Sequence, residues 1–311
     1  MPKYFQRALF WFKASRPEFF TGSIVPIMVG GALAYHDRGY LQWGYLLLSL
    51  LALILLHATA NLANDYYDHL SGNDEINTEF ATPFTGGSRV IQQGKAAAGR
   101  VLAAALICMA VAALIGIYLA WMRGWVILLI GVIGGLSGFF YTAKPLQLGY
   151  RGLGEIFIGL DFGVLPVLTA YYVQVQHFSW AAFVASLPVA FLIMAILWIN
   201  QFQDFKADKA VNKLHWVVRL GRRRASYVYT GMMAATYLSI LVGVFTGLLP
   251  PLGAIALLAV PVAIFAVKTA VTRYDDLPRL TPANAATVVI HLATGILLTV
   301  GVVVDKWISR V

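Results

Sequence analysis

The apolar stretch YLLLSLLALILLHAT (45–59) runs directly into ANLANDYYDHLSGNDE (60–75), which holds three aspartates and three asparagines. An uncharged run of this kind predicts a helix inside a membrane, and carboxylates at its end are costly unless they are paired or solvated. The same succession recurs where AFLIMAILWI (190–199) leads into NQFQDFKADK (200–209). Any account of the protein must explain both acidic segments.

The composition indicates an integral membrane protein with an all-α fold. Of the 311 residues, 59% are hydrophobic and 12% are charged, against about 25% charged residues in soluble domains. Long continuous apolar runs favour helices over a β-barrel, and a helical span needs about 20 residues. We therefore expect one transmembrane domain, 1–311, with nine spans: Phe19–Tyr35, Leu41–Asn64, Val101–Met122, Gly124–Ala143, Ile156–Gln176, Ser179–Gln203, two within Ala225–Val267 divided at Pro250-Pro251, and Thr281–Val304.

The N-terminal segment 1–18 is basic and aromatic and has no small-residue cleavage site. It is predicted to be an interfacial amphipathic segment rather than a signal peptide. The single cysteine, Cys108, falls within the third predicted span, which excludes an internal disulfide and a cysteine-based zinc site.

The charge distribution predicts an orientation in the membrane. The net charge of +9 does not indicate nucleic-acid binding, because 19 of the 23 Lys and Arg lie at the N-terminus or in alternate loops. The positive-inside rule places these segments in the cytoplasm and the C-terminus outside, in a cell (inner) membrane. Nine of the fourteen carboxylates also gather on the cytoplasmic side. Acidic residues do not follow this rule, so their clustering needs another cause.

The spacing of the acidic motifs predicts a metal site. Residues four apart share a helix face, so Asn64 lies above Asp68, and Asn200, Asp204 and Asp208 form one stripe. Ligand sets made only of oxygen suit Mg²⁺, which also takes phosphate oxygens from substrates. Two facing motifs would hold Mg²⁺ and clamp a diphosphate between them. The predicted metal ligands are Asn64, Asp68, Asp74, Asn200, Asp204 and Asp208.

Basic residues near the motifs are candidates for neutralising the phosphate charge that remains: Arg89, Lys144, Arg151, Lys213 and Arg219. Without a metal, carboxylates would repel a diphosphate, by about 4 kcal/mol for unit charges about 4 Å apart at an effective dielectric of about 20. The alternative is that the aspartates only cap helices in headgroup water. This explanation suits one aspartate better than two matched arrays.

Four segments resemble the motifs of the UbiA superfamily of intramembrane aromatic prenyltransferases: NLANDYYDHLSGND (61–74), TPFTGGSRV (82–90), YTAKPLQLGYRGLGE (141–155) and NQFQDFKADKAVNKLHWVVRLG (200–221). The nearest branch by resemblance acts on 1,4-dihydroxy-2-naphthoate in menaquinone synthesis. The resemblance implies a nine-helix bundle around a central cavity open to lipid, with Mg²⁺ and a polyprenyl diphosphate bound at the acidic motifs. It implies prenyl transfer to an aromatic acceptor, with loss of CO₂ for a naphthoate. By position, Asn64, Asp68, Asp204 and Asp208 match metal ligands, and Asp65 and Asp74 match other acidic positions.

Some residues depart from this pattern. NKLH (212–215) stands where Gly-Lys-x-Thr is usual, and Lys144 and Asp161 occupy positions that are commonly uncharged. An ionisable residue within a span is a functional candidate, so Asp161 is predicted either to contact the acceptor or to pair with a neighbouring helix. Tyr141 would offer a π-face to an allylic cation. The catalytic candidates are Asp65, Tyr141, Lys144 and Asp161.

Other functions remain open. The acceptor could instead be a hydroxybenzoate, a homogentisate or a glycerol-phosphate lipid. A non-enzymatic transporter is the alternative from another class, although transporters place their polar site near the bilayer midplane. A CDP-alcohol phosphotransferase requires Asp-Gly and then Ala-Arg after the first acidic pair, whereas Asp68 is followed by His69, Leu70 and Ser71.

Overall fold

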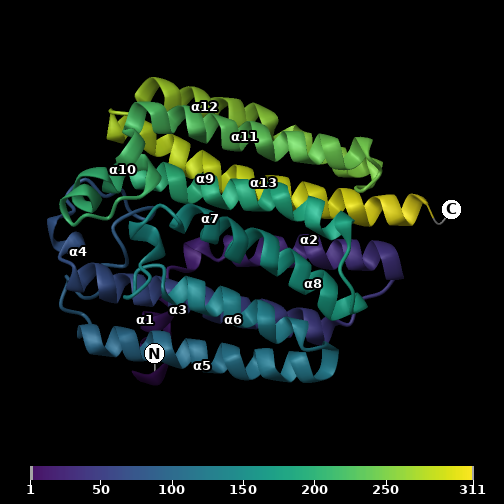
Figure 1. Cartoon of the computed structure of the whole chain (residues 1–311), viewed down its shortest axis with the longest axis horizontal. Helices are drawn as coiled ribbons and strands as arrows, with labels where there is room; N and C mark the ends of the chain where they lie inside the picture. The colour runs from purple at the N-terminus through teal and green to yellow at the C-terminus, as the bar shows by residue number, and fades with distance from the viewer. Residues whose placement is uncertain (1–2, 310–311) are drawn as a thin grey trace.

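A computed structural model describes residues 3–309, all of which lie in helices or in the turns and loops between them (Figure 1). The elements in chain order are α1 (Lys3–Ala14), η1 (Pro17–Phe19), α2 (Thr21–Arg38), α3 (Trp43–Leu70), α4 (Asn73–Ile76), α5 (Ala98–Arg123), α6 (Val126–Phe139), η2 (Leu148–Tyr150), α7 (Gly154–Gly159), the π-helical turn η3 (Leu160–Val164), α8 (Leu165–Val175), α9 (Trp180–Ala210), α10 (Trp216–Leu220), α11 (Arg222–Phe245), η4 (Pro251–Ala259), α12 (Val260–Arg273) and α13 (Leu277–Ile308). The predicted all-α membrane fold is confirmed.

Within residues 3–309, eight helical stretches are long and apolar enough to cross a membrane, where nine were predicted. The difference lies at the predicted span Gly124–Ala143, where α6 has 14 residues and is therefore about 21 Å long. Helix α6 stops early because the chain turns after Phe139. The carbonyls of Phe140 and Tyr141 accept hydrogen bonds from the backbone N–H groups of Leu148 and Gly149, at 3.1 and 2.9 Å. Hydropathy counts these residues as apolar but cannot detect the turn.

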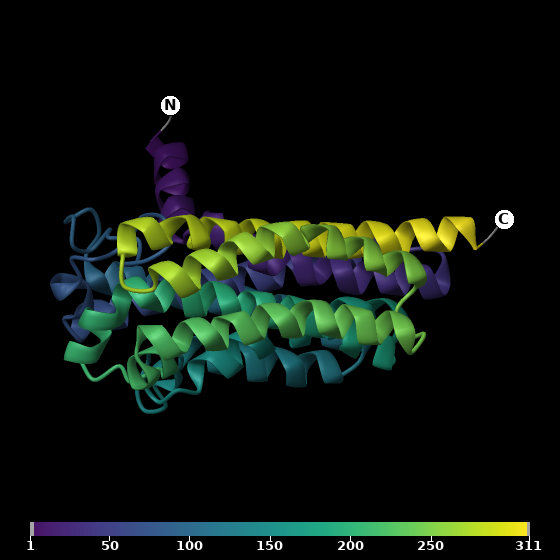
Figure 2. The same ribbon diagram turned by 90° about the horizontal axis from the view of Figure 1, so that it is seen from above.

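The long helices lie side by side along one direction (Figures 1 and 2). Helix α3 packs against α5, α2 against α8 and α13, and α9 against α11 and α13. Close approach depends on small residues at the crossings. A Cβ atom on Gly30 of α2 would lie 2.3 Å from the carbonyl oxygen of Val167 in α8. Any side chain at Gly30 would therefore push these two helices apart.

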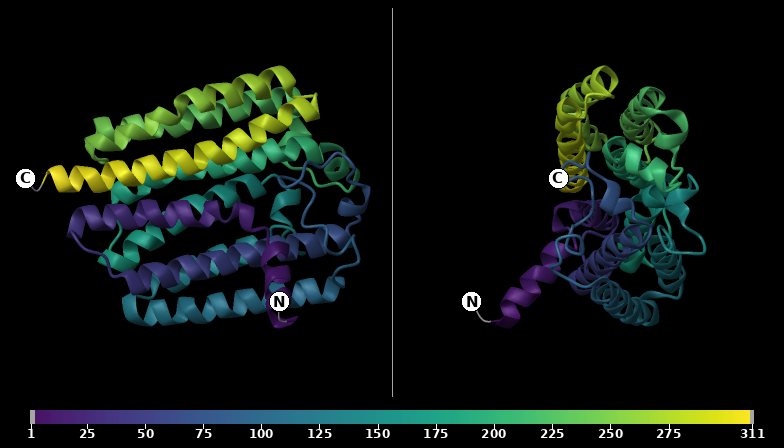
Figure 3. Two further views of the ribbon diagram at one scale, coloured as in Figure 1. Left: turned by 180° about the vertical axis from the view of Figure 1, so that it is seen from behind. Right: turned by 90° about the vertical axis from the view of Figure 1, so that its left-hand side faces the viewer.

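Helix α1 projects away from the bundle at a steep angle to the long helices (Figures 2 and 3). Several of its large apolar side chains are exposed, namely Tyr4, Phe5, Leu9 and Phe12. This arrangement suits the predicted interfacial segment 1–18, whose position at a membrane surface stays a prediction.

Both acidic motifs lie at the same end of the bundle. Helices α3 and α9 end there, beside α4 and α10, on the left of Figure 1. The C-terminus lies at the opposite end. Two motifs about 140 residues apart in sequence are thereby brought to one site.

Candidate functional site

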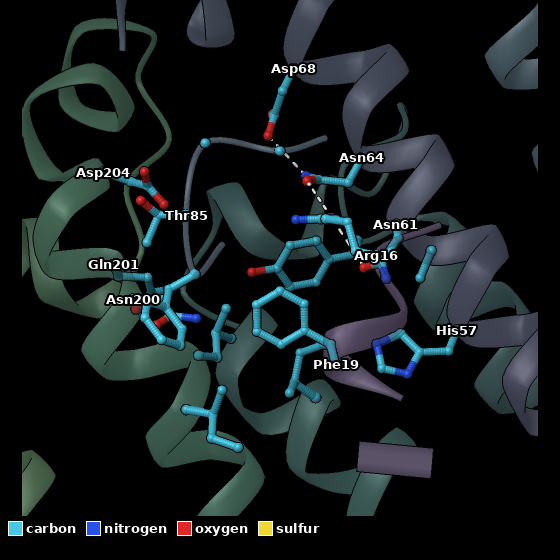
Figure 4. A pocket seen from close by; sticks show the side chains of 18 of the residues that line it. Arg16, Phe19, His57, Asn61, Asn64, Asp68, Thr85, Asn200, Gln201 and Asp204 are labelled. Carbon is cyan, nitrogen blue, oxygen red and sulfur yellow. Dashed lines mark hydrogen bonds between the residues drawn. The ribbon is translucent and has the colours of Figure 1, made fainter. Parts of the chain in front are cut away.

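A cavity of about 180 Å³ opens between α3, α9 and the loops at this end of the bundle (Figure 4). Its lining includes both acidic motifs, and the predicted site residues among it are Asn64, Asp68, Asp74, Tyr141, Asn200, Asp204, Asp208 and Lys213. The two anionic segments therefore face one another across a single space, as the spacing of the motifs predicts.

The α3 side of the cavity is organised by Arg16, which lies just before η1. One Arg16 guanidinium nitrogen donates to the amide oxygens of Asn61 and Asn64 at 3.1 and 3.3 Å and lies 4.0 Å from Asp65. The amide nitrogen of Asn64 donates in turn to Asp68 at 2.8 Å. The helix spacing of three and four residues aligns these groups along one face of α3.

Lys213 connects the two motifs directly. Its buried ammonium lies 3.0 Å from Asp68 in α3 and 3.5 Å from Asp208 in α9. Asn73, within the first motif, and Asn77, just after it, also reach the second: Asn73 donates to Asp208 at 2.8 Å, and Asn77 donates to Asp204 at 2.7 Å. The two acidic motifs are thus close enough to act on one ligand.

The segment NKLH (212–215) follows α9 and leads into α10. Asn212 has a φ of 57°, a left-handed conformation that asparagine tolerates better than most residues in place of glycine. His215 caps α10, because its Nδ1 accepts from the N–H of Val218 at 3.4 Å. The Nε2 of His215 then carries the proton and donates to Asp208 at 2.9 Å. His215 therefore helps to hold the Asp208 carboxylate, and the N–H of Lys213 bonds to the backbone carbonyl of the same aspartate.

Several carboxylates lie close together on the loop side of the cavity, and they change the pKa of Asp74 and of Lys213. Burial, together with the nearby carboxylates of Asp68 and Asp65, raises the pKa of Asp74 to about 8, although Arg89 and Lys213 lower it in part. For Lys213, burial lowers the pKa, but Asp208 and Asp68 more than offset this, so that the pKa lies well above its ordinary value. A site that holds its carboxylates this close together favours an added cation.

The oxygen atoms of the site suit Mg²⁺, provided that water and substrate supply the remaining ligands. Within residues 3–309, no three His, Cys, Asp or Glu side chains are grouped closely enough to hold a metal by themselves. Mg²⁺ commonly takes one or two carboxylates and completes its shell with water and substrate phosphate oxygens. The facing pairs Asp68 and Asp74, and Asp204 and Asp208, supply such carboxylates. The geometry therefore suits a metal that binds together with a phosphorylated substrate.

Five other predicted site residues do not line this cavity. The Asp65 carboxylate accepts from the backbone N–H and the hydroxyl of Ser88 and is buried beneath the loop. Arg89 donates to the backbone oxygens of Asp74 and Asn77. Arg151 and Arg219 are exposed and bond to backbone carbonyls, and Lys144 is exposed. Asp65 and Arg89 hold the loop that closes the site, and among the five predicted cations Lys213 lines the cavity.

Asp161 also lies outside this cavity, in the wall of a second, more apolar one of about 340 Å³ between α3, α5, α6 and α8. Its Oδ2 accepts from Ser137 of α6 at 2.6 Å, whereas its Oδ1 has no partner in the described chain. The adjacent Phe162 faces the first cavity. The π-helical turn η3 therefore separates the two spaces.

Several residues at the cavity were not predicted from the sequence: Arg16, His57, Asn73, Asn77, Gln201 and His215. A signal existed for His57, because it lies four residues before Asn61 and eleven before Asp68 and so shares their face of α3. Arg16 is remote in sequence from both motifs, and the sequence does not show that the chain folds back onto α3.

Comparisons with known proteins agree with this geometry. A relative from Synechocystis, a 2-carboxy-1,4-naphthoquinone phytyltransferase, is 29% identical, with 94% of this chain and 92% of the relative covered. A 1,4-dihydroxy-2-naphthoate octaprenyltransferase from Bacillus subtilis is 28% identical, with 94% and 91% covered. The fold is similar to that of a UbiA homolog from Archaeoglobus fulgidus solved with GPP and Mg²⁺, with a TM-score of 0.62, 15% identity, and 93% and 99% coverage.

A model of the UbiA prenyltransferase family matches residues 23–288, which include both acidic motifs and the helices that carry them. The match extends over most of the chain, and the relatives are named as prenyltransferases. This integral membrane protein is a prenyltransferase that belongs to the UbiA family.

Proposed function

We propose that the protein transfers a polyprenyl group from an allylic polyprenyl diphosphate to 1,4-dihydroxy-2-naphthoate, with loss of CO₂, in a Mg²⁺-dependent reaction. The similarity to naphthoate prenyltransferases over more than nine-tenths of the chain supports this acceptor. The product would be demethylmenaquinol, the reduced form of demethylmenaquinone.

The observation that carries the proposal is the position of Lys213 between Asp68 and Asp208, which belong to opposite motifs. A diphosphate bound here meets the Lys213 ammonium and carboxylates on two sides. Such an arrangement suits a ligand that brings divalent metal with it, because the carboxylates alone would repel phosphate.

At the acidic end, the residues of the chain act on the leaving group. Asp68, Asp74, Asp204 and Asp208 would hold Mg²⁺, which when bound neutralises the charge that develops on the departing diphosphate. Lys213 adds a fixed positive charge, and the amides of Asn73 and Asn77 orient the carboxylates of Asp208 and Asp204 before substrate arrives. The carbon–oxygen bond to the prenyl group then breaks, and the electron pair leaves with the diphosphate.

The acceptor ring attacks the allylic carbon and forms the new carbon–carbon bond. In a naphthoate, the attacked carbon carries the carboxylate, so release of CO₂ returns its bonding electrons to the ring and restores aromaticity. Tyr141 lines the cavity and offers a π-face to the transient positive charge. No base is needed at the attacked carbon.

The test is Asp204→Asn, assayed in detergent with Mg²⁺, a polyprenyl diphosphate and dihydroxynaphthoate. We expect turnover to fall by at least about 100-fold, the scale seen when an electrostatic contact to a transition state is removed. The matched control is Asp275→Asn, an exposed cytoplasmic-end carboxylate, which should keep its rate. An Asp204→Asn enzyme with unimpaired rate and Mg²⁺ dependence refutes the assignment, and wild-type turnover of only another acceptor refutes the naphthoate.

We also propose that the site lies at the cytoplasmic face of the cell membrane, with the C-terminus outside. The support is the excess of Lys and Arg in the segments at the acidic end. Lipid surrounds the bundle and receives the prenyl tail, which gains about 0.8 kcal/mol for each buried CH₂.

A further inference from the structure

The cavity has a second end, where a single histidine stands in an apolar wall. His57, Asn61, Asn64 and Asp68 follow a spacing of four, three and four residues on α3, and all four line the cavity. His57 therefore lies about 16 Å along the helix from Asp68. Figure 4 shows His57 and Phe19 at the end of the cavity away from Asp68 and Asp204.

The surroundings of His57 are almost wholly apolar. Phe162 lies against the imidazole, with ring centroids 4.4 Å apart, and Phe20 packs on it at 5.4 Å. The apolar residues that line the cavity pack together as one cluster: Phe19, Ile158, Phe162, Ile193, Ile196 and Val288. A flat apolar ring fits this end better than a phosphate does.

Only one of the two imidazole nitrogens of His57 has a hydrogen-bond partner in the described chain. Nδ1 bonds to the hydroxyl of Ser23 in α2 at 3.0 Å, which orients the ring. In the described chain, no side chain or backbone group bonds to Nε2, although the ring lines the cavity. A ligand that covers this nitrogen without bonding to it would bury a polar atom without a partner, which is rare in proteins. The ligand that fills this end should therefore offer one.

We propose that His57 binds a ring hydroxyl of the aromatic acceptor through Nε2 and so positions the acceptor for attack. This inference rests on the proposed function. A hydroxyl suits either tautomer, because it can donate to a bare Nε2 or accept from a protonated one. The ring of the acceptor then lies in the apolar cluster, with the diphosphate held at the acidic end of the same cavity.

Two other occupants of this end fit less well. A prenyl tail has no polar atom, so it would leave Nε2 unpaired at a cost of about 1–3 kcal/mol. A water molecule needs two to four polar partners, whereas the rings of Phe162 and Phe20 pack against the imidazole. The hydroxyl-bearing acceptor satisfies both the apolar wall and the free nitrogen.

The test is direct binding to purified protein of two probes, 1,4-dihydroxy-2-naphthoate and its 1,4-dimethoxy analogue, by isothermal titration under anaerobic conditions. The wild type should prefer the dihydroxy probe by about tenfold, the effect of one buried hydrogen bond. His57→Leu should lose most of this preference, and His57→Gln, which keeps a donor and an acceptor, should retain part of it. Binding of a prenyl diphosphate with Mg²⁺ should change by less than about twofold in both variants.

His291→Leu is the matched control, since His291 is equally buried, in α13, but does not line the cavity. It should keep the wild-type preference. Ser23→Ala tests the same contact if His57→Leu fails to fold, and it should weaken the preference by releasing Nδ1.

Three results would overturn the inference: a wild type that binds both probes equally, a preference that persists in His57→Leu, or a His57→Leu protein whose prenyl diphosphate binding falls as much as its acceptor binding. Failure of the proposed function looks different, because a wild type that binds dihydroxynaphthoate but never prenylates it would refute the reaction and leave the binding result standing.

Discussion

The single side chain of Lys213 links the two acidic motifs. Its ammonium is buried between Asp68 and Asp208 and compensates both carboxylates where no metal is bound. The loop 211–215 positions it, since the N–H of Lys213 donates to the carbonyl of Asp208 at 2.8 Å. Lys213 is therefore a structural partner of the acids and, in the proposed function, a cation that meets the diphosphate.

We expect Lys213→Met to lower the melting temperature strongly in EDTA, because removing one partner of a buried ion pair costs about 3–5 kcal/mol. Added Mg²⁺ should raise the melting temperature of the variant more than that of the wild type, since the metal replaces the lost positive charge. Differential scanning fluorimetry measures both effects.

Lys206→Met provides the control, because Lys206 pairs with Glu79 at the surface, where a pair contributes about 0–1 kcal/mol. A Lys213→Met protein that Mg²⁺ stabilises no more than the wild type would contradict the shared role of lysine and metal.

Asp161 is an isolated acid within a span. Its bond to Ser137 and its place in the second cavity favour a structural pairing between η3 and α6 over contact with the acceptor. Asp161→Asn should therefore leave the acceptor KM and the pH profile of turnover within about twofold of the wild type, since the amide keeps an oxygen for Ser137. A raised acceptor KM with an unchanged KM for prenyl diphosphate would instead support the catalytic role.

At the scale of elements, the loop between α4 and α5 closes the cavity. Asp65 anchors it through Ser88, and Arg89 anchors it through the carbonyls of Asp74 and Asn77. Gly86 and Gly87 both have positive φ angles, of 84° and 70°, and both line the cavity. The turn brings the loop backbone against the acids because neither residue carries a Cβ atom.

Gly87→Ala tests this arrangement, because a Cβ there would lie 2.8 Å from Oδ1 of Asp65. We expect a higher KM for prenyl diphosphate and a lower melting temperature. Gly94→Ala is a close control in the same loop: its φ is 66°, and nothing lies within 4 Å of the added atom.

In both variants the alanine must adopt a left-handed backbone conformation, which costs about 1–2 kcal/mol. The difference between the two variants in KM and melting temperature therefore reports the contact with Asp65. Equal kinetics for the two variants would mean that the anchor at Asp65 does not matter for diphosphate binding.

At the scale of the molecule, the arrangement of the spans places the acidic end and the C-terminus at opposite ends of the bundle (Figure 1). With the positive-inside rule, this predicts which loops face the cytoplasm. In a Cys108→Ala background, single cysteines at Lys209 and His177 report the two sides, because both positions are exposed. An impermeant maleimide should label His177→Cys in intact cells and Lys209→Cys only after permeabilisation. Labelling in the reverse order would invert the proposed orientation.

The sequence by itself determined the class of the fold and the two acidic motifs, because hydropathy and helix spacing are local properties. Long apolar windows predict the spans, and the four-residue spacing of Asn200, Asp204 and Asp208 predicts one cavity-facing stripe, which the structure has. The resemblance in the motifs led to the same family as the comparisons. Hydropathy overestimated the length of α6. The turn that ends this helix is closed by backbone hydrogen bonds, and these do not change the hydropathy of the sequence.

Only the tertiary structure decided which charged residues share the cavity. Proximity in sequence made Arg89, Arg151 and Arg219 as good candidates as Lys213, yet these three bond to backbone carbonyls. Arg16 reaches the cavity because the segment before α2 folds back against α3, a contact between elements that no local pattern encodes, whereas His57 lies on the α3 face that also carries Asn61 and Asp68. A site made by helices that meet across a bundle depends on their packing, and packing follows from the shapes of all the helices together.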